Sequence, residues 1–142
     1  MIIISISSGL NEDEELAYEN AEKMQSMLKD PDSFRLYDKM FLLKHYDENG
    51  NNDYTYTIFK YGGSNSYGAI ITDEAVFKNK KYIMNYDENL DKDDDDYLDK
   101  LKVKADIAMY LMTGENATWE KVEIDVELIK DELGLDWASL DM

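Results

Sequence analysis

Hydrophobic residues recur every three or four positions in three segments of the chain, which is the spacing of one face of a helix. The segments are residues 11–28, 94–112 and 126–133. Gly114 and Gly134 follow the second and third segments, where glycine commonly ends a helix, and Asp125 precedes the third as an N-cap. The periodic positions are Leu16, Ala17, Ala21, Met24 and Leu28; Leu98, Leu101, Ala105, Ala108 and Leu111; and Ile129 and Leu133.

The part of the chain between the first two helices is rich in β-branched and aromatic residues, which favours strands. The predicted strands are 36–46, 54–61, 69–72, 75–78, 81–86 and, after the second helix, 119–124. Asn49-Gly50 is a hairpin signal between the first two. We therefore predict an α+β fold in a single domain, residues 1–142: an antiparallel sheet of about five or six strands, with two longer helices and a short C-terminal helix packed on one face.

The composition and net charge of the chain exclude several kinds of site and several classes of protein. The 142 residues include no cysteine, which excludes disulfides, cysteine-ligated metals and thiol catalysis. No apolar run is long enough to span a membrane. The formal net charge of −17 has the wrong sign for direct nucleic-acid binding, which needs clustered lysine and arginine. The 44% hydrophobic content is nevertheless too high for a disordered acidic tail.

The negative charge is concentrated in the predicted helices. Residues 1–34 carry eight acids and two bases, residues 35–86 six acids and seven bases, and residues 87–142 eighteen acids and six bases. The densest run is 89–100, with six aspartates. Aspartates at a helix start cap backbone amides and complement the helix dipole. Two would serve that role, so the four consecutive aspartates 93–96 leave excess charge that indicates a partner.

A calcium-binding loop is the first alternative explanation for such runs of acidic residues. An EF-hand loop requires glycine at position 6 and glutamate at position 12. A loop starting at Asp47 has Asn52 and Ile58 there, and one starting at Asp91 has Asp96 and Lys102. Both segments therefore read as turns or caps, and we predict neither a metal site nor a cofactor. The glycine-rich stretch 62–68 lacks the spacing of a phosphate or dinucleotide loop and reads as a wide turn or bulge.

Few residues are suited to catalysis. His45 is the only histidine, in a strand position that favours a structural role, and Arg35 is the only arginine. Carboxylates are so abundant that no particular pair is indicated. We therefore predict that the protein is not an enzyme.

Two phrases resemble a known family. Leu28-Lys-Asp-Pro-Asp-Ser-Phe-Arg-Leu-Tyr-Asp38 and Asn65-Ser-Tyr-Gly68 are similar to phrases in an uncharacterised family of small bacterial domains, usually secreted or borne by lipoproteins. The resemblance covers roughly residues 12–86 and, more weakly, residues 124–135. It implies an α+β fold and no known enzymatic activity, and it implies a secreted or cell-envelope binding module, in which Tyr54, Tyr56, Tyr61 and Tyr67 would offer an aromatic surface beside the glycine-rich turn.

The charge favours a different function. We expect an acidic interaction protein that inhibits a nucleic-acid-binding protein or nuclease by imitating a polyanion, as some phage-encoded inhibitors of bacterial defence do. A basic protein is the expected partner. The candidate partner-binding residues are Asp91, Asp93, Asp94, Asp95, Asp96, Asp99, Asp106, Glu12, Asp13 and Glu15.

The N-terminal segment bears on location and assembly. Residues 1–6 are apolar and rich in isoleucine, which predicts a first strand or an apolar arm and would permit a homodimer through an unpaired strand edge. The segment lacks the basic and longer apolar regions of a signal peptide. We therefore expect a cytoplasmic protein, or an extracytoplasmic one if the true start lies upstream with a signal peptide.

Overall fold

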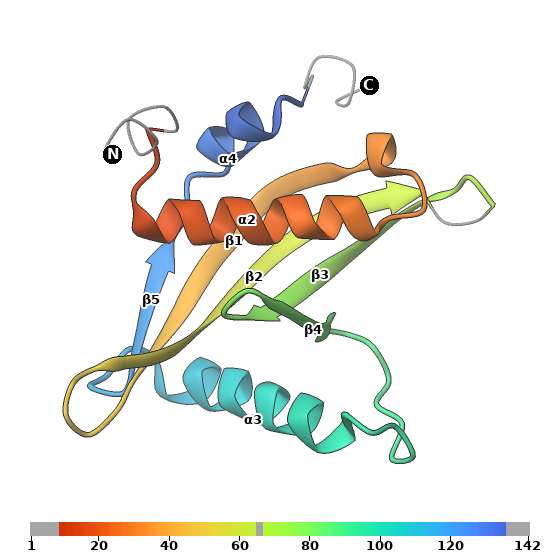
Figure 1. Cartoon of the computed structure of the whole chain (residues 1–142). Helices are drawn as coiled ribbons and strands as arrows, with labels where there is room; N and C mark the ends of the chain where they lie inside the picture. Colours follow the sequence, from red (N-terminus) through yellow and green to blue (C-terminus); the bar gives the residue numbers. More distant parts are fainter. Residues whose placement is uncertain (1–8, 65–66, 136–142) are drawn as a thin grey trace.

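The computed structural model describes residues 9–64 and 67–135, which form three α-helices, a short 3-10 helix and five strands (Figure 1). Residues 1–6, predicted as a strand or an apolar arm, lie outside the described part. The elements in chain order are α2 (Glu12–Met27), η1 (Pro31–Ser33), β1 (Arg35–Tyr46), β2 (Asn52–Ser64), β3 (Ile70–Lys78), β4 (Lys81–Asn85), α3 (Tyr97–Thr113), β5 (Trp119–Glu123) and α4 (Val126–Leu133).

The five strands form one antiparallel sheet in the order β4-β3-β2-β1-β5, which confirms the predicted α+β class. Strands β1 to β4 follow one another as a meander, and β5 returns to pair with β1 after α3. The predicted strands 69–72 and 75–78 are one strand, β3, because Asp73 and Glu74 continue its pairing with Tyr61 and Lys60 of β2.

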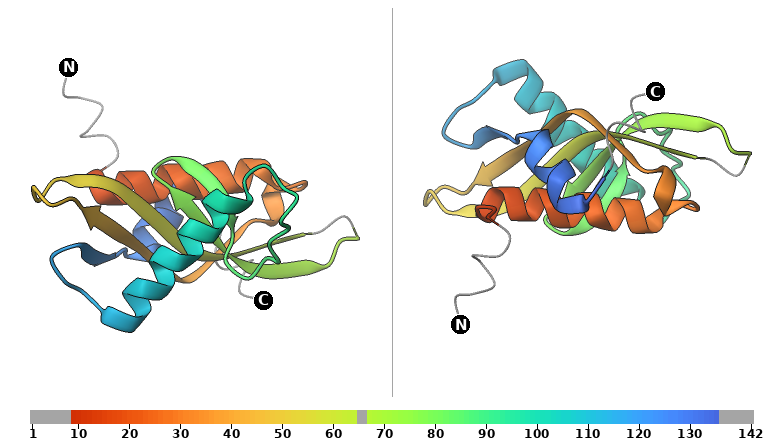
Figure 2. Two further views of the ribbon diagram at one scale, coloured as in Figure 1. Left: turned by 90° about the horizontal axis from the view of Figure 1, so that it is seen from below. Right: turned by 90° about the horizontal axis from the view of Figure 1, so that it is seen from above.

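Both faces of the sheet are covered, so the prediction that all helices pack on one face is wrong. Helices α2 and α4 lie on one face and α3 on the other (Figures 1 and 2). Adjacent strand residues such as Leu42 and Leu43, which point to opposite faces, are both fully buried. Because the central strands are apolar on both sides, each face needs a helix to exclude water.

Helix α3 packs on the sheet through the side opposite to the one that the sequence predicted. Val103, Ile107 and Tyr110 of α3 are buried against the sheet, whereas the periodic positions used to predict this helix face solvent. Helix α2 follows its prediction, with Ala17 and Met24 buried. The sequence of α3 has apolar residues on two opposite sides, and periodicity alone cannot say which side meets the sheet.

The predicted caps of α4 are present, whereas the start of α3 has no side-chain cap. Asp125 accepts a hydrogen bond from the Glu127 amide (3.0 Å) and Gly134 has left-handed backbone geometry, so both predicted caps of α4 are confirmed. Helix α2 begins with a capping box between Asn11 and Glu14. Asp96 precedes α3 but makes no side-chain capping hydrogen bond, so capping does not explain the aspartate run.

The glycine-rich stretch is partly strand. Gly62 and Gly63 belong to β2 and pair with Thr72 and Ile71 of β3. A Cβ atom on Gly63 would lie 2.7 Å from Cδ1 of Leu28, and one on Gly62 would lie 3.0 Å from the Tyr37 hydroxyl. These glycines allow neighbouring side chains to approach the strand closely.

Candidate protein-binding surface

The segment between β4 and α3 carries the densest exposed charge of the described residues. We call residues 91–99, which run from the end of this connection into the first residues of α3, the acidic segment; all six of its aspartates are exposed. Two successive turns form its first part, in which the amides of Asp94 and Tyr97 donate to the carbonyls of Asp91 and Asp94 (3.0 and 3.1 Å). The Asp91 carboxylate also accepts from the Asp93 amide (2.9 Å). The acidic segment is therefore a pair of turns followed by the first residues of α3.

Within the described part of the chain, Lys100 is the one cation that pairs with the acidic segment. Lys100 lies 2.9 Å from a Glu88 carboxylate oxygen and 3.6 Å from one of Asp96, and the Glu88 hydrogen bond raises its pKa. The other five aspartates make no ion pair with any residue in 9–64 or 67–135. Their carboxylates are exposed to solvent.

Asp106 does not belong to this exposed row, although the sequence analysis placed it there. Its carboxylate points to the sheet and accepts hydrogen bonds from the hydroxyls of Tyr56 (2.5 Å) and Tyr54 (3.3 Å). Burial, together with this carboxylate, raises the pKa of Tyr54 to about 12 and that of Tyr56 further. Asp106 thus satisfies buried hydroxyl groups and holds α3 against the sheet.

The predicted acids of α2 lie apart from the acidic segment, since α2 and α3 cover opposite faces of the sheet (Figure 2). Asp13 forms an ion pair with Lys44 at 2.9 Å. Together with Glu12 and Glu15 it lines a separate pocket of about 500 Å³ that also contains Lys44 and Lys80. The structure therefore gathers the six aspartates 91–99 on one surface and separates Glu12, Asp13 and Glu15 from them.

The tyrosines expected to form an aromatic surface are mostly internal. Tyr56 and Tyr61 are buried and Tyr54 is half-buried, whereas Tyr67 is 93% exposed. His45 stacks on Tyr54 with ring centroids 4.5 Å apart, and its Nδ1 lies 2.6 Å from an Asp53 carboxylate oxygen. This contact lowers the pKa of Asp53. These contacts give His45 a structural setting, in line with the role expected from the sequence.

Helix α3 also has an exposed apolar face, and the sequence analysis took four of its five residues to be buried, with Leu111 in place of Met112. We call Leu98, Leu101, Ala105, Ala108 and Met112 the outer stripe; all five are exposed. Leu98 is 74% and Met112 83% exposed. Figure 2 (left) views the molecule from the side of α3, and no other described helix covers it. The spacing of these apolar residues is visible in the sequence. The sequence analysis assigned it to the side of α3 that packs on the sheet, whereas it belongs to the side that faces solvent.

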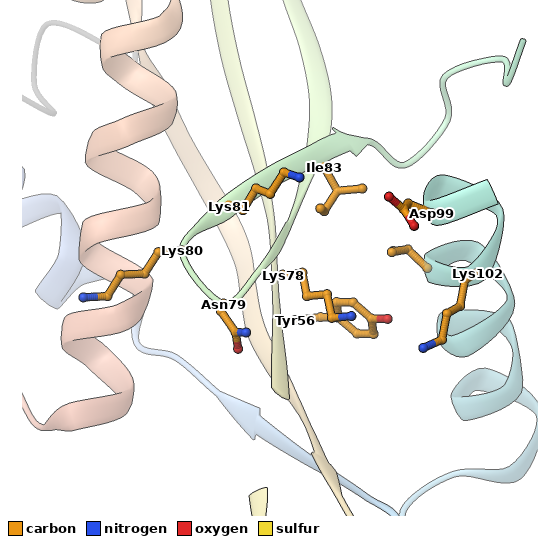
Figure 3. A pocket seen from close by; sticks show the side chains of 9 residues that line it. Tyr56, Lys78, Asn79, Lys80, Lys81, Ile83, Asp99 and Lys102 are labelled. Atoms are coloured by element: carbon orange, nitrogen blue, oxygen red, sulfur yellow. The ribbon is translucent and has the colours of Figure 1, made fainter. Parts of the chain in front are cut away.

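A pocket of about 540 Å³ lies between the β3–β4 hairpin and α3 (Figure 3). Four lysines and Asp99 line it, with Tyr56, Ile83 and Val103 supplying apolar surface. Lys80 points toward α2 and pairs with Glu19 at 3.0 Å. The ammonium groups of Lys78 and Lys102 lie 4.5 and 5.6 Å from the centre of the Tyr54 ring. The lining is suited to holding a small anion, and it places no nucleophile beside a histidine base.

Across residues 9–64 and 67–135, no group of three or more histidine, aspartate or glutamate side chains is arranged to hold a metal ion. None of the described helices is long and apolar enough to cross a membrane. No protein-family model, no curated protein and no solved structure matches this chain.

Proposed function

We propose that this protein is a non-enzymatic inhibitor that binds a basic nucleic-acid-binding protein or nuclease by presenting the acidic segment in place of a nucleic-acid backbone. The observation that carries the proposal is the exposure of six aspartates within nine residues, five of them without an ion pair to any described residue. A groove lined by lysine and arginine would attract this surface from a distance.

The density of the carboxylates supports the comparison with phosphate groups. Phosphates follow each strand of duplex DNA about every 3.4 Å along the axis, so a nucleic acid presents closely spaced negative charges. Asp95 lies in the turn before α3 and Asp99 in the first turn of the helix. Asp91 and Asp94 extend this row into the turns. The row is shorter than the sequence analysis expected, because Asp106 faces the sheet.

The use of the titratable side chains also supports a non-enzymatic function. His45 contacts Asp53 and stacks within an aromatic cluster, and the Tyr56 hydroxyl donates to Asp106. These are structural contacts that stabilise the fold. In contrast, the aspartate carboxylates of the acidic segment are exposed to solvent.

The test measures inhibition of a basic nuclease, or competition with DNA for a basic DNA-binding protein, at low and moderate salt. We expect inhibition to weaken as salt rises, because screening reduces attraction between exposed charges. Replacing Asp93 and Asp96 with serine, and Asp94 and Asp95 with asparagine, should weaken binding about tenfold or more at low salt.

A matched control removes four charges elsewhere on the exposed surface: Asp30→Asn, Asp32→Asn, Glu48→Gln and Asp131→Asn. Both variants have the same net charge, so a loss confined to the first assigns binding to the acidic segment. Unchanged inhibition by the first variant contradicts the proposal. An equal loss in both variants would attribute the effect to net charge alone and contradict the assigned site.

A further inference from the structure

The outer stripe of α3 has the spacing of a helix–helix contact. Its residues follow one another at intervals of three and four, from Leu98 to Met112, which is the a/d pattern of a two-helix seam. The opposite side of the helix already packs on the sheet through Val103, Ile107 and Tyr110. The fold of the monomer therefore does not use the stripe.

This exposure is unusual for a protein with so much charge. Isolated apolar residues on a surface are normal, but a continuous stripe along a whole helix is typical of an interface. The helix has 17 residues and is therefore about 25 Å long. Met109 and Leu111, also exposed, lie beside the stripe and widen it.

We propose that the outer stripe pairs with the same stripe of a second copy, with the two α3 helices antiparallel. Large residues then meet at the ends, where Leu98 of one copy faces Met112 of the other. At the centre Ala105 faces its own copy, and this small side chain lets the two backbones approach closely. Leu101 faces Ala108, so the two layers between the centre and the ends each combine a large with a small residue.

Charge selects the antiparallel orientation. A parallel pair would bring the two acidic segments together, and each carries six aspartates. An antiparallel pair separates them by about the 25 Å length of the helix, which is several times the Debye length of about 8 Å at physiological salt. Repulsion between the copies is then small at the contact, where the residues are uncharged.

The seam is smaller than a standard protein interface, which buries about 800 Å² on each partner. We therefore expect a weak dimer with a dissociation constant of about 10–100 μM. Such a dimer would present two acidic segments, one at each end of the helix pair. This consequence rests on the proposed function, whereas the dimer itself does not.

The first experiment is sedimentation equilibrium of the full chain at several protein concentrations, at about 0.05 and 0.5 M NaCl. Dimerisation should strengthen with salt, because screening reduces repulsion between two chains of charge −17. Binding to a basic partner should weaken with salt. The two responses have opposite signs, so failure of the dimer and failure of the proposed function are distinguishable.

Substitutions identify the interface. Changing Leu98, Leu101 and Met112 to serine should weaken dimerisation about 100-fold, since both copies lose the three large side chains of the outer stripe. These residues are exposed, so the fold should be retained, which circular dichroism checks. The matched control is Ile70→Ser with Ile71→Ser, two exposed apolar residues of β3 that should leave dimerisation unchanged.

Cross-linking tests the orientation, because the chain contains no cysteine. Leu98→Cys mixed with an affinity-tagged Met112→Cys should give a mixed disulfide-linked dimer under mild oxidation, and Leu98→Cys alone should give little. The proposal is overturned if the protein stays monomeric at about 1 mM in 0.5 M NaCl. It is equally overturned if Leu98→Cys preferentially links to itself, or if the β3 control also dissociates the dimer.

Discussion

At the scale of single residues, the Asp106 carboxylate joins α3 to the sheet through two tyrosine hydroxyls. The Tyr56 side chain is fully buried and its hydroxyl requires an acceptor, which Asp106 supplies at 2.5 Å. If the outer stripe of α3 faced the sheet, this hydroxyl would lose its partner and be buried without a hydrogen bond. The hydrogen bond thus favours the side of the helix that carries Val103 and Ile107.

Removing this carboxylate should therefore reduce stability. We expect Asp106→Ala to lower the free energy of unfolding by about 2 kcal/mol, because it leaves the Tyr56 hydroxyl unpaired. Urea denaturation measures the difference. Asp95→Ala, at an exposed position of the acidic segment, is the control and should stay within about 0.5 kcal/mol of the parent. Equal effects of the two changes would show that Asp106 has no special structural role.

The raised pKa values of the buried tyrosines predict that the free energy of unfolding depends on pH. Burial raises the pKa of Tyr54 from 10.0 to about 12, and the pKa values of Tyr56 and Tyr82 are raised as well. The unfolded chain loses these protons near pH 10 while the folded chain keeps them. The contribution to stability is thus fully present below pH 10 and is lost as pH rises through 12.

Urea denaturation at a series of alkaline pH values measures this loss. Tyr82→Phe removes one contributing group and should make the decline with pH shallower. Tyr67→Phe, at a position that is 93% exposed, should leave the decline unchanged. A free energy of unfolding that stays constant from pH 9 to about pH 12 would contradict the assignment.

At the scale of elements, the β3–β4 hairpin connects the sheet to α2. Asn79 has a positive φ of 52°, which asparagine tolerates better than most residues. Its side-chain oxygen accepts from the Thr55 amide (3.1 Å), and its carbonyl accepts from buried Asn20 of α2 (2.9 Å). The two-residue turn therefore fixes the edge of the sheet and the position of the helix together.

Two substitutions at Asn79 separate the contribution of its side-chain hydrogen bond from that of its positive φ. We expect Asn79→Ala to lower the free energy of unfolding by about 2 kcal/mol, because it loses a hydrogen bond and places alanine in left-handed geometry. Asn79→Gly loses the same hydrogen bond but accepts the positive φ, so it should cost about 1 kcal/mol. Thermal or urea unfolding compares the two. A glycine variant less stable than the alanine variant would contradict this explanation.

At the scale of the whole molecule, charge and apolar surface meet on α3. The acidic segment leads into the first turn of the helix, and the outer stripe runs along it from Leu98 to Met112. Salt weakens attraction between the acidic segment and a basic groove, and it strengthens contact between two stripes of like-charged chains. The effect of ionic strength on partner binding and on self-association therefore separates the two roles that we propose for this surface.

The sequence by itself determined the local features of the protein. Periodicity identified the three helices and most strands, Asp125 and Gly134 marked the ends of α4, and the turn chemistry of Asp47 was read correctly, since its carboxylate accepts from two backbone amides. These features depend on contacts within a few residues, which the order of residues specifies directly. The density of charge at residues 91–99 was likewise a property of the sequence.

Only the tertiary structure decided which surfaces face the sheet and which face solvent. Helix α3 has two apolar sides, and its orientation depends on Tyr54 and Tyr56, which are about 50 residues away in the chain and share Asp106 as acceptor. The same packing placed α2 and α3 on opposite faces and so separated Glu12 and Glu15 from the acidic segment. These outcomes follow from burying apolar residues on both faces of the sheet while pairing every buried hydroxyl, a long-range requirement that local patterns do not contain.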